Sequence, residues 1–112
     1  MDKIIQYQKI ILNYFQELKD WQFAGDDCAF ITDVEHGHFQ IMSYGWNKEQ
    51  TKYMTNIIIH YQLKPDGKIW IIENKTEEDV AQALTNRGAS KDDIVLGFIP
   101  QRARQHTGYA LA

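Results

Sequence analysis

One stretch of the sequence has the residue types of a metal-dependent nuclease. Pro65-Asp66 followed by Glu73-Asn74-Lys75 spells the P-D…E-x-K pattern, in which two carboxylates bind one metal ion. That chemistry needs both carboxylates within a few ångströms of the metal. Asp66 is expected in a turn, and Glu73 lies seven residues further along an extended strand, about 23 Å away at ~3.3 Å per residue. The spacing therefore favours a turn-forming role for Asp66 over a nuclease site.

A second group of potential metal ligands lies between residues 33 and 38. Asp33, Glu35, His36 and His38 have side chains that bind metals in proteins. The His-Gly-His order is also typical of a turn, where polar residues and glycine are expected without any ligand. We therefore expect a solvated turn here, and the sequence predicts neither a metal site nor a bound cofactor.

Cys28 and His60 are the residues that could serve covalent or acid–base catalysis. Cys28 opens a predicted strand and has no nucleophile motif around it, which favours a small buried residue. His60 lies in the middle of a predicted strand among apolar neighbours, where a structural histidine is commoner than a catalytic one. We assign no catalytic residues, and we do not expect an enzyme.

Contact with a partner is the remaining chemistry that the sequence offers. Arg102, Arg104 and His106 are each separated by one residue, so an extended chain would place them on one side, facing phosphate or an acidic partner. A solvated loop is the alternative. The aromatic residues on the predicted strands could form a patch or belong to the core. The candidate partner-contacting residues are Trp46, Tyr53, His60, Trp70, Arg102, Arg104, His106 and Tyr109.

Composition predicts one ordinary globular domain over residues 1–112. Of the 112 residues, 44% are hydrophobic and 24% are charged, which is enough apolar material for one core. The formal charge of -3 argues against a surface that neutralises many DNA phosphates, so DNA contact is expected to be indirect or weak. The single cysteine cannot form an internal disulfide, Met1-Asp2-Lys3 opens no signal peptide, and the apolar runs are too short to span a membrane. We expect a cytoplasmic protein.

The first half of the chain predicts a helix followed by antiparallel strands. Apolar residues recur three or four apart from Ile4 to Trp21, which indicates an amphipathic helix over 2–20. Further apolar positions widen its surface, so a second subunit could cover part of it, although packing on the sheet of the same chain is the favoured alternative. Strands are predicted at 28–34, 39–44 and 52–63. On the long strand, period two places Ile57, Ile59, Tyr61 and Leu63 on the core face and Ile58 and His60 on the other.

The second half begins with the strongest local signal, the turn at 64–68, where a proline and a glycine close a hairpin into a strand at 68–73 that is apolar on both faces. A second helix is predicted at about 76–87, because Thr76 and Asp79 resemble a capping box, with Gly88 ending the helix. A short helical turn from Ser90 then leads into the apolar run 94–98. The apolar end, 107–112, is expected to dock on the fold. The predicted class is α+β, with a mainly antiparallel sheet.

The order and spacing of short motifs along the whole chain resemble the XisI family, the fdxN element excision controlling factor proteins of cyanobacteria. The motifs are Met1-Asp2-Lys3 with Tyr7, Gly45-Trp46, His60, Asp66-Gly67-Lys68-Ile69-Trp70-Ile71, Thr76-Glu77 with Ala81, Asp93-Ile94-Val95-Leu96-Gly97-Phe98, and Thr107-Gly108-Tyr109-Ala110 with Ala112.

This resemblance implies a non-enzymatic accessory protein that controls a site-specific recombinase, works with a nuclease-like companion and self-associates. Our first hypothesis is therefore an interaction module, acting as a homo-oligomer through its sheet face and C-terminal segment. A second is a small-molecule or nucleotide-binding regulator with a pocket near His60, Trp70 and residues 102–106. A third, direct DNA binding, would appear as a salt-dependent mobility shift.

Overall fold

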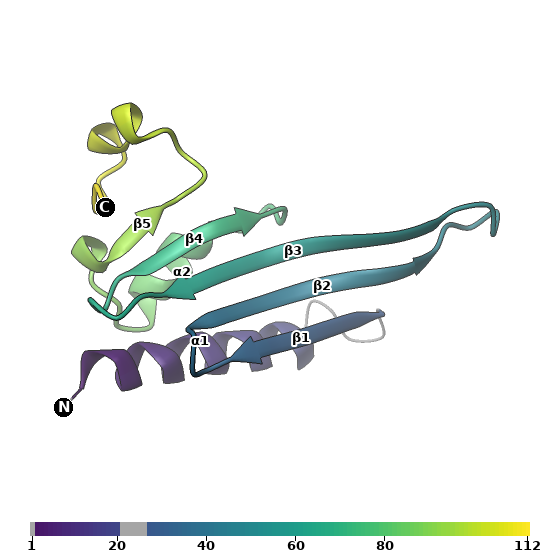
Figure 1. Ribbon diagram of the computed structural model, residues 1–112, viewed down its shortest axis with the longest axis horizontal. Helices are drawn as coiled ribbons and strands as arrows, with labels where there is room; N and C mark the ends of the chain where they lie inside the picture. Colours follow the sequence, from purple (N-terminus) through teal and green to yellow (C-terminus); the bar gives the residue numbers. More distant parts are fainter. Residues whose placement is uncertain (1, 21–26) are drawn as a thin grey trace.

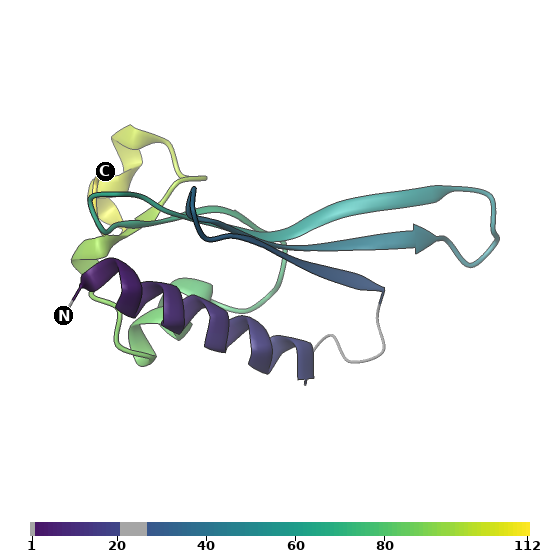
Figure 2. The same ribbon diagram turned by 60° about the horizontal axis from the view of Figure 1, so that its bottom comes forward.

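The computed structural model describes residues 2–20 and 27–112, and within them two helices pack on one face of a five-stranded sheet (Figure 1, Figure 2). The elements are helix α1 (Lys3–Asp20), strands β1 (Cys28–Asp33), β2 (His38–Trp46), β3 (Tyr53–Leu63) and β4 (Ile69–Asn74), helix α2 (Val80–Asn86), the 3₁₀ turn η1 (Lys91–Asp93), strand β5 (Ile94–Leu96) and the 3₁₀ turn η2 (Gln101–His106). The strands lie side by side in chain order, antiparallel except for the parallel pair β4–β5. The predicted α+β class is confirmed.

The core lies between the two helices and the inner face of the sheet. Helix α1 forms where the sequence predicts it, although Trp21 and residues 24–26 lie outside the described residues. Removing each large apolar side chain from water contributes on the order of 1.5–3 kcal/mol, so this layer supplies most of the driving force. The fully buried large side chains are Tyr14, Tyr61, Phe39, Ile11, Ile41, Ile59, Ile69, Ile71, Leu84, Ile94 and Val95.

The hairpin between β3 and β4 confirms the predicted turn at 64–68. The Lys64 N–H donates to the Lys68 carbonyl at 2.9 Å, and the Gly67 N–H donates to the Lys64 carbonyl at 2.8 Å. Gly67 has a φ of 88°, which a residue with a Cβ rarely adopts. The Asp66 side chain accepts from the Lys68 N–H at 3.0 Å, so this carboxylate stabilises the turn.

Two β-bulges change which side chains face the core. Ile41 pairs with Ile59 and Met42 with Ile57, which leaves Ile58 as an extra residue on β3. The predicted alternation is correct from Ile59 onward and wrong before it, because a bulge shifts the period by one residue. Ile58 packs against the core, whereas Ile57 is 39% exposed on the opposite face.

The second bulge lies on β4. Tyr61 pairs with Ile71 and His60 with Glu73, so Ile72 is the extra residue. Ile72 is 39% exposed, while Ile71 is buried in the core. The prediction that this strand is apolar on both faces is therefore confirmed.

Helix α2 starts later than predicted. The N-cap is Asp79, whose carboxylate accepts from the Gln82 N–H at 3.1 Å, and the helix begins at Val80 instead of near residue 76. Thr76 belongs to the preceding turn, where its hydroxyl donates to the Asn74 side chain at 2.6 Å. Thr76 and Asp79 are both residues that can cap a helix. Asp79 takes the N-cap position, so the helix starts after Asp79 instead of after Thr76. Gly88 follows the helix, as predicted.

The C-terminal segment, residues 97–112, docks on the body but is not extended at the basic cluster. Residues 101–106 form the 3₁₀ turn η2, so the extended arrangement that would place the three basic side chains on one side is not formed. The tail itself docks as expected: the Ala110 N–H donates to the Ile94 carbonyl at 2.8 Å, and Tyr109 packs against the core. Strand β5 is short and lies at the edge of the sheet, and this bond attaches the tail to its first residue.

Candidate interaction surface

Both helices lie on one face of the sheet (Figure 2). Several large apolar side chains on the opposite, outer face are exposed in the described residues. Strand alternation and the two bulges place these residues there. Large exposed apolar side chains that gather on one face are typical of interaction sites, which makes this face a candidate. The exposed large side chains of this face are Ile31 (43%), Tyr44 (42%), Trp46 (57%), Tyr53 (52%), Ile57 (39%) and Ile72 (39%).

Strands β2 and β3 extend beyond their neighbours as a two-stranded arm (Figure 1). We define the arm as Tyr44–Trp46, Tyr53–Thr55 and the loop 47–52. The rings of Trp46 and Tyr53 contact edge to face at its end, with centroids 5.4 Å apart. The arm makes the molecule long, 46 × 32 × 24 Å, with a radius of gyration of 14.9 Å against the ~13 Å expected for a compact chain of this length.

A groove of about 530 Å³ lies where the arm leaves the body. Its polar side includes His60, Glu73 and Lys75, and the last two form an ion pair at 3.7 Å. Burial, and then the charge of His38, lower the pKa of His60, and ring nitrogens of the two histidines are 3.0 Å apart. The groove is lined by Met42, Thr55, Asn56, Ile57, His60, Ile72, Glu73 and Lys75.

Trp70 lies elsewhere, between two cations. The Lys64 ammonium is 4.0 Å from the ring centroid and the Arg104 guanidinium carbon is 5.1 Å from it. Arg104 also donates to the carbonyls of Ile99 at 3.0 Å and Leu111 at 3.2 Å. Arg104 therefore positions the C-terminal segment, and its side chain is already used inside the protein.

The remaining predicted contact residues lie near this segment. Arg102 and His106 are exposed on η2, while Tyr109 is half-buried. The eight candidates thus form two groups instead of one patch. Trp46, Tyr53 and His60 lie on the arm and in the groove, and the rest surround the C-terminal segment. Sequence reasoning missed Ile57 and Ile72 as exposed residues because nothing local in the sequence marks the bulges.

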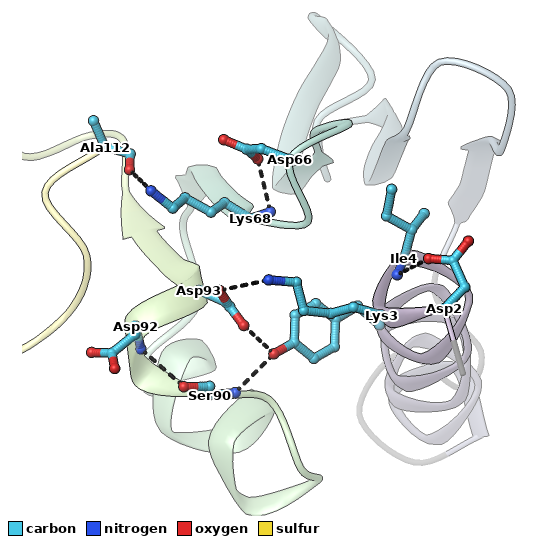
Figure 3. A network of polar contacts seen from close by, with 10 residues as sticks. Asp2, Lys3, Ile4, Asp66, Lys68, Ser90, Asp92, Asp93 and Ala112 are labelled. Carbon is cyan, nitrogen blue, oxygen red and sulfur yellow. Dashed lines mark hydrogen bonds and ion pairs between the residues drawn. The ribbon is translucent and has the colours of Figure 1, made fainter.

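A polar network joins the first helix to the residues just before β5, and a separate contact holds the last residue (Figure 3). The Tyr7 hydroxyl donates to Asp93 at 2.5 Å and accepts from the Ser90 N–H at 3.2 Å, and the Lys3 ammonium binds the same carboxylate at 3.1 Å. The Lys68 ammonium donates to the Ala112 carbonyl. Several motif positions of the sequence therefore hold the fold together.

The potential nuclease and metal residues do not gather. Asp66 lies in the turn, Glu73 pairs with Lys75, and His36 binds Asp33 at 2.8 Å on the surface. In the part of the chain that the structure describes, no three histidine, cysteine or acidic side chains are grouped so that they could hold a metal ion. Nor does that part contain a helix both long enough and apolar enough to cross a membrane.

Comparison with known proteins identifies the relatives of this fold. The sequence model of the XisI protein family matches residues 1–111. The chain belongs to the XisI family. The crystal structure of the fdxN element excision controlling factor XisI from Anabaena variabilis matches with a TM-score of 0.85 and 27% identity, covering 99% of this chain and 100% of that one. The crystal structure of a XisI-like protein from the same organism matches with a TM-score of 0.86 and 32% identity, covering 97% and 99%. A search of curated proteins finds no match.

Membership in the XisI family agrees with the resemblance drawn from the short motifs. The network around Asp93 gives a physical reason for part of that pattern, because Lys3, Tyr7 and Asp93 contact one another across the fold. XisI motifs at both ends of the chain thus meet at one place.

Proposed function

We propose that this XisI-family protein is a non-enzymatic accessory factor that controls the site-specific excision of a DNA element. It acts in the cytoplasm through protein contacts with a recombinase or a nuclease-like companion. The observation that carries the proposal is family membership over residues 1–111, together with a solved relative named as an excision controlling factor. Because the formal charge is -3, we expect direct binding to DNA phosphates to contribute little to this role.

The C-terminal segment is the partner surface that we favour. Phe98 is 51% exposed and Leu111 is 56% exposed, and Arg102 and His106 lie exposed between them in sequence. Apolar side chains with neighbouring cations suit a partner surface that is itself partly acidic. Because Arg104 and Trp70 hold the segment in place, the exposed side chains are presented on an ordered support.

The test uses the purified chain, a candidate recombinase and nuclease-like companion from the same cell, and a DNA substrate containing the element. We expect Phe98→Asp and Arg102→Glu to abolish complex formation and to change excision frequency by at least tenfold. Ile5→Asp is the matched control, because Ile5 is 49% exposed on α1, at a comparable exposure to Phe98. Excision that proceeds equally with and without the chain would contradict the proposal.

A small-molecule regulator is the second candidate function, and the groove at His60 favours it. The groove does not include Trp70 or residues 102–106, so the single pocket expected from the sequence is divided between two places. A thermal-shift screen against nucleotides and metabolites tests this candidate, since a specific ligand raises the melting temperature and His60→Gln should remove the rise. A screen without any shift contradicts it.

A further inference from the structure

Strand β3 continues beyond the end of β4 and leaves one edge of the sheet open there (Figure 1). The pairs between β3 and β4 end at Ile59 and Asn74, and the Lys75 N–H makes one further bond to the Ile58 carbonyl at 2.8 Å. Residues 53–57 pair with β2 on one side and, among the described residues, with no strand on the other. We call this second side of residues 53–57 the open edge, which is about 17 Å long at ~3.3 Å per residue.

The register of the arm shows which backbone groups point out of the open edge. The Asn47 N–H donates to the Lys52 carbonyl at 3.0 Å, next to the pair of Trp46 with Tyr53. Hydrogen-bonded pairs alternate with non-hydrogen-bonded pairs along an antiparallel ladder. Tyr53 and Thr55 therefore belong to the non-hydrogen-bonded pairs and turn their N–H and C=O groups away from β2, toward the open edge.

The opposite edge of the arm confirms this alternation and differs from the open edge in one respect. Tyr44 on β2 is the partner of Thr55, so its backbone groups must point away from β3. The Tyr44 N–H does so, and it donates to the Asp27 carbonyl at 3.1 Å. The β2 side of the arm thus has a backbone partner at this level, whereas the Thr55 backbone has none among the described residues.

The open edge has none of the usual protection against pairing with another chain. Exposed edge strands commonly carry charged side chains or proline, which discourage an added strand. Residues 53–57 include neither, and the bulge at Ile58 comes only after them. Tyr53, Thr55 and Ile57 are instead residue types that favour a strand. This edge is therefore a ready template for a further strand.

The groove of about 530 Å³ lies beside the open edge, where β4 would run if it were longer. Thr55 and Ile57 line it from β3, and Ile72, Glu73 and Lys75 line it from the end of β4. A strand laid along the open edge would place every second side chain on the same face as Thr55 and Ile57. Those side chains would enter the groove.

We propose that the open edge binds an extended peptide segment of a partner protein as an added strand. The N–H and C=O groups of Tyr53 and Thr55 alternate with the repeat of a strand, and a second extended backbone supplies donors and acceptors at the same repeat. A compact small molecule does not. The main chain of the segment provides the bonds, and the groove selects its side chains.

The side chains around the open edge define the segment that fits it. Ile57 and Ile72 at the groove favour apolar residues at every second position, with polar residues between them. The loop at the end of the arm carries Lys48 and Lys52, both exposed, against one acidic residue, Glu49. We therefore expect an acidic residue at the end of the segment that lies beside the loop. This site is separate from the C-terminal segment.

Amide hydrogen exchange of the purified chain, followed by NMR, tests the state of the open edge. In the free chain we expect the Tyr53 and Thr55 amides to exchange at least roughly tenfold faster than the Met54 and Asn56 amides, which bond to β2. A bound segment should slow Tyr53 and Thr55 selectively. Protection of these two amides in the free chain that rises with protein concentration would overturn the inference, because a second copy would then occupy the edge.

Binding is measured with a set of labelled, capped peptides about six residues long, by fluorescence anisotropy. Their polar residues alternate with valine, isoleucine or tyrosine, and an acidic residue stands at either end. Thr55→Pro removes the outward N–H, which proline permits at a sheet edge, and should weaken binding at least about tenfold. Thr55→Val is the matched control, because it keeps the N–H and the shape of the side chain, and it should bind like the parent.

Modified peptides test the same bonds with the native chain, so the result does not depend on how Thr55→Pro folds. Methylating the backbone nitrogen at every second position removes the donors from one edge of the peptide strand. One of the two alternate patterns should abolish binding and the other should leave it intact. No binding by any peptide of the set at ~1 mM, or equal binding by both methylated forms, would overturn the inference. These measurements use the chain and synthetic peptides, so their result is separate from that of the excision assay.

Discussion

The Tyr7 hydroxyl and the Asp93 carboxylate form a 2.5 Å hydrogen bond that joins helix α1 to the residue immediately before β5. Tyr7 is 4% exposed, and its pKa is raised by burial and then by the hydrogen bond to Asp93. Lys3, one turn earlier on the helix, binds the other oxygen of the same carboxylate. One acidic side chain therefore fixes the N-terminal end of α1 against the end of the sheet.

We expect Tyr7→Phe to lower the free energy of unfolding by about 1–3 kcal/mol, because it removes a hydrogen bond to a charged group and leaves the Ser90 N–H without its acceptor. Lys3→Ala should cost less than about 1 kcal/mol, since its ammonium is exposed. Urea denaturation measures both. A double-mutant cycle with Asp93→Asn should show a coupling energy for Tyr7 larger than that for Lys3. Additive effects of Tyr7→Phe and Asp93→Asn would mean that this bond is not formed in solution.

The sequence predicts those parts of the fold that depend on local signals. The amphipathic spacing of α1 and the Pro–Gly turn at 64–68 are each contained within a few residues, and both form as expected. Register depends on pairing between distant strands, so neither bulge could be predicted, and Ile57 was placed on the wrong face. The start of α2 and the η2 turn also depend on contacts beyond their own residues, such as Arg104 on Trp70.

The candidate site likewise has parts that local sequence signals predict and parts that depend on pairing between distant strands. Trp46 and Tyr53 were predicted as contact residues from their type and position on strands, and the structure places them together at the end of the arm. The groove beside them depends on both bulges, and the sequence does not indicate it. The charge of Arg104 predicts a contact with a partner, but in the structure its guanidinium donates to the carbonyls of Ile99 and Leu111 and so holds the C-terminal segment.

Gly37→Ala is expected to destabilise the protein severely. Gly37 has a φ of 75°, and a Cβ there would lie 2.1 Å from the Leu63 carbonyl oxygen. The backbone cannot move away easily, because the Leu63 N–H donates to the Gly37 carbonyl at 2.7 Å. We expect a loss of more than about 3 kcal/mol, measured by thermal or urea unfolding. The control is Gly108→Ala, where φ is also positive but a Cβ meets nothing within 4 Å, so only the conformational cost of roughly 1 kcal/mol applies. Equal losses at the two positions would contradict this account.

Tyr61→Phe is expected to leave stability unchanged or to raise it by up to about 1 kcal/mol. The Tyr61 side chain is fully buried, and its hydroxyl has no hydrogen-bond partner among the described residues. Burial raises the pKa of this phenol well above its usual value, which shows how poorly the site solvates a polar group. Removing an unsatisfied hydroxyl while keeping the ring retains the packing against Phe15 and removes the desolvation cost. A loss of 2 kcal/mol or more in urea unfolding would mean that the hydroxyl has a partner in solution.

Stability should fall as the pH drops below about 6.5, and His60 should account for part of that fall. The pKa of His60 is lowered in the folded chain by burial and by the charge of His38. The unfolded chain therefore binds a proton near the ordinary histidine pKa of ~6.5, while the folded chain does so only at lower pH. Between these two values the unfolded state holds more protons, so the free energy of unfolding decreases as the pH decreases.

The charged groups that face His60 set the direction of this effect and supply its controls. His38 on β2 opposes protonation of His60, and Glu73, its cross-strand neighbour on β4, is itself paired with Lys75. We expect His60→Gln to flatten the pH dependence of urea unfolding between pH 5 and 7. His106→Gln, at an exposed position on η2, should leave the slope as it is in the parent. Parallel curves for the parent and His60→Gln would show that the low-pH loss arises from other groups.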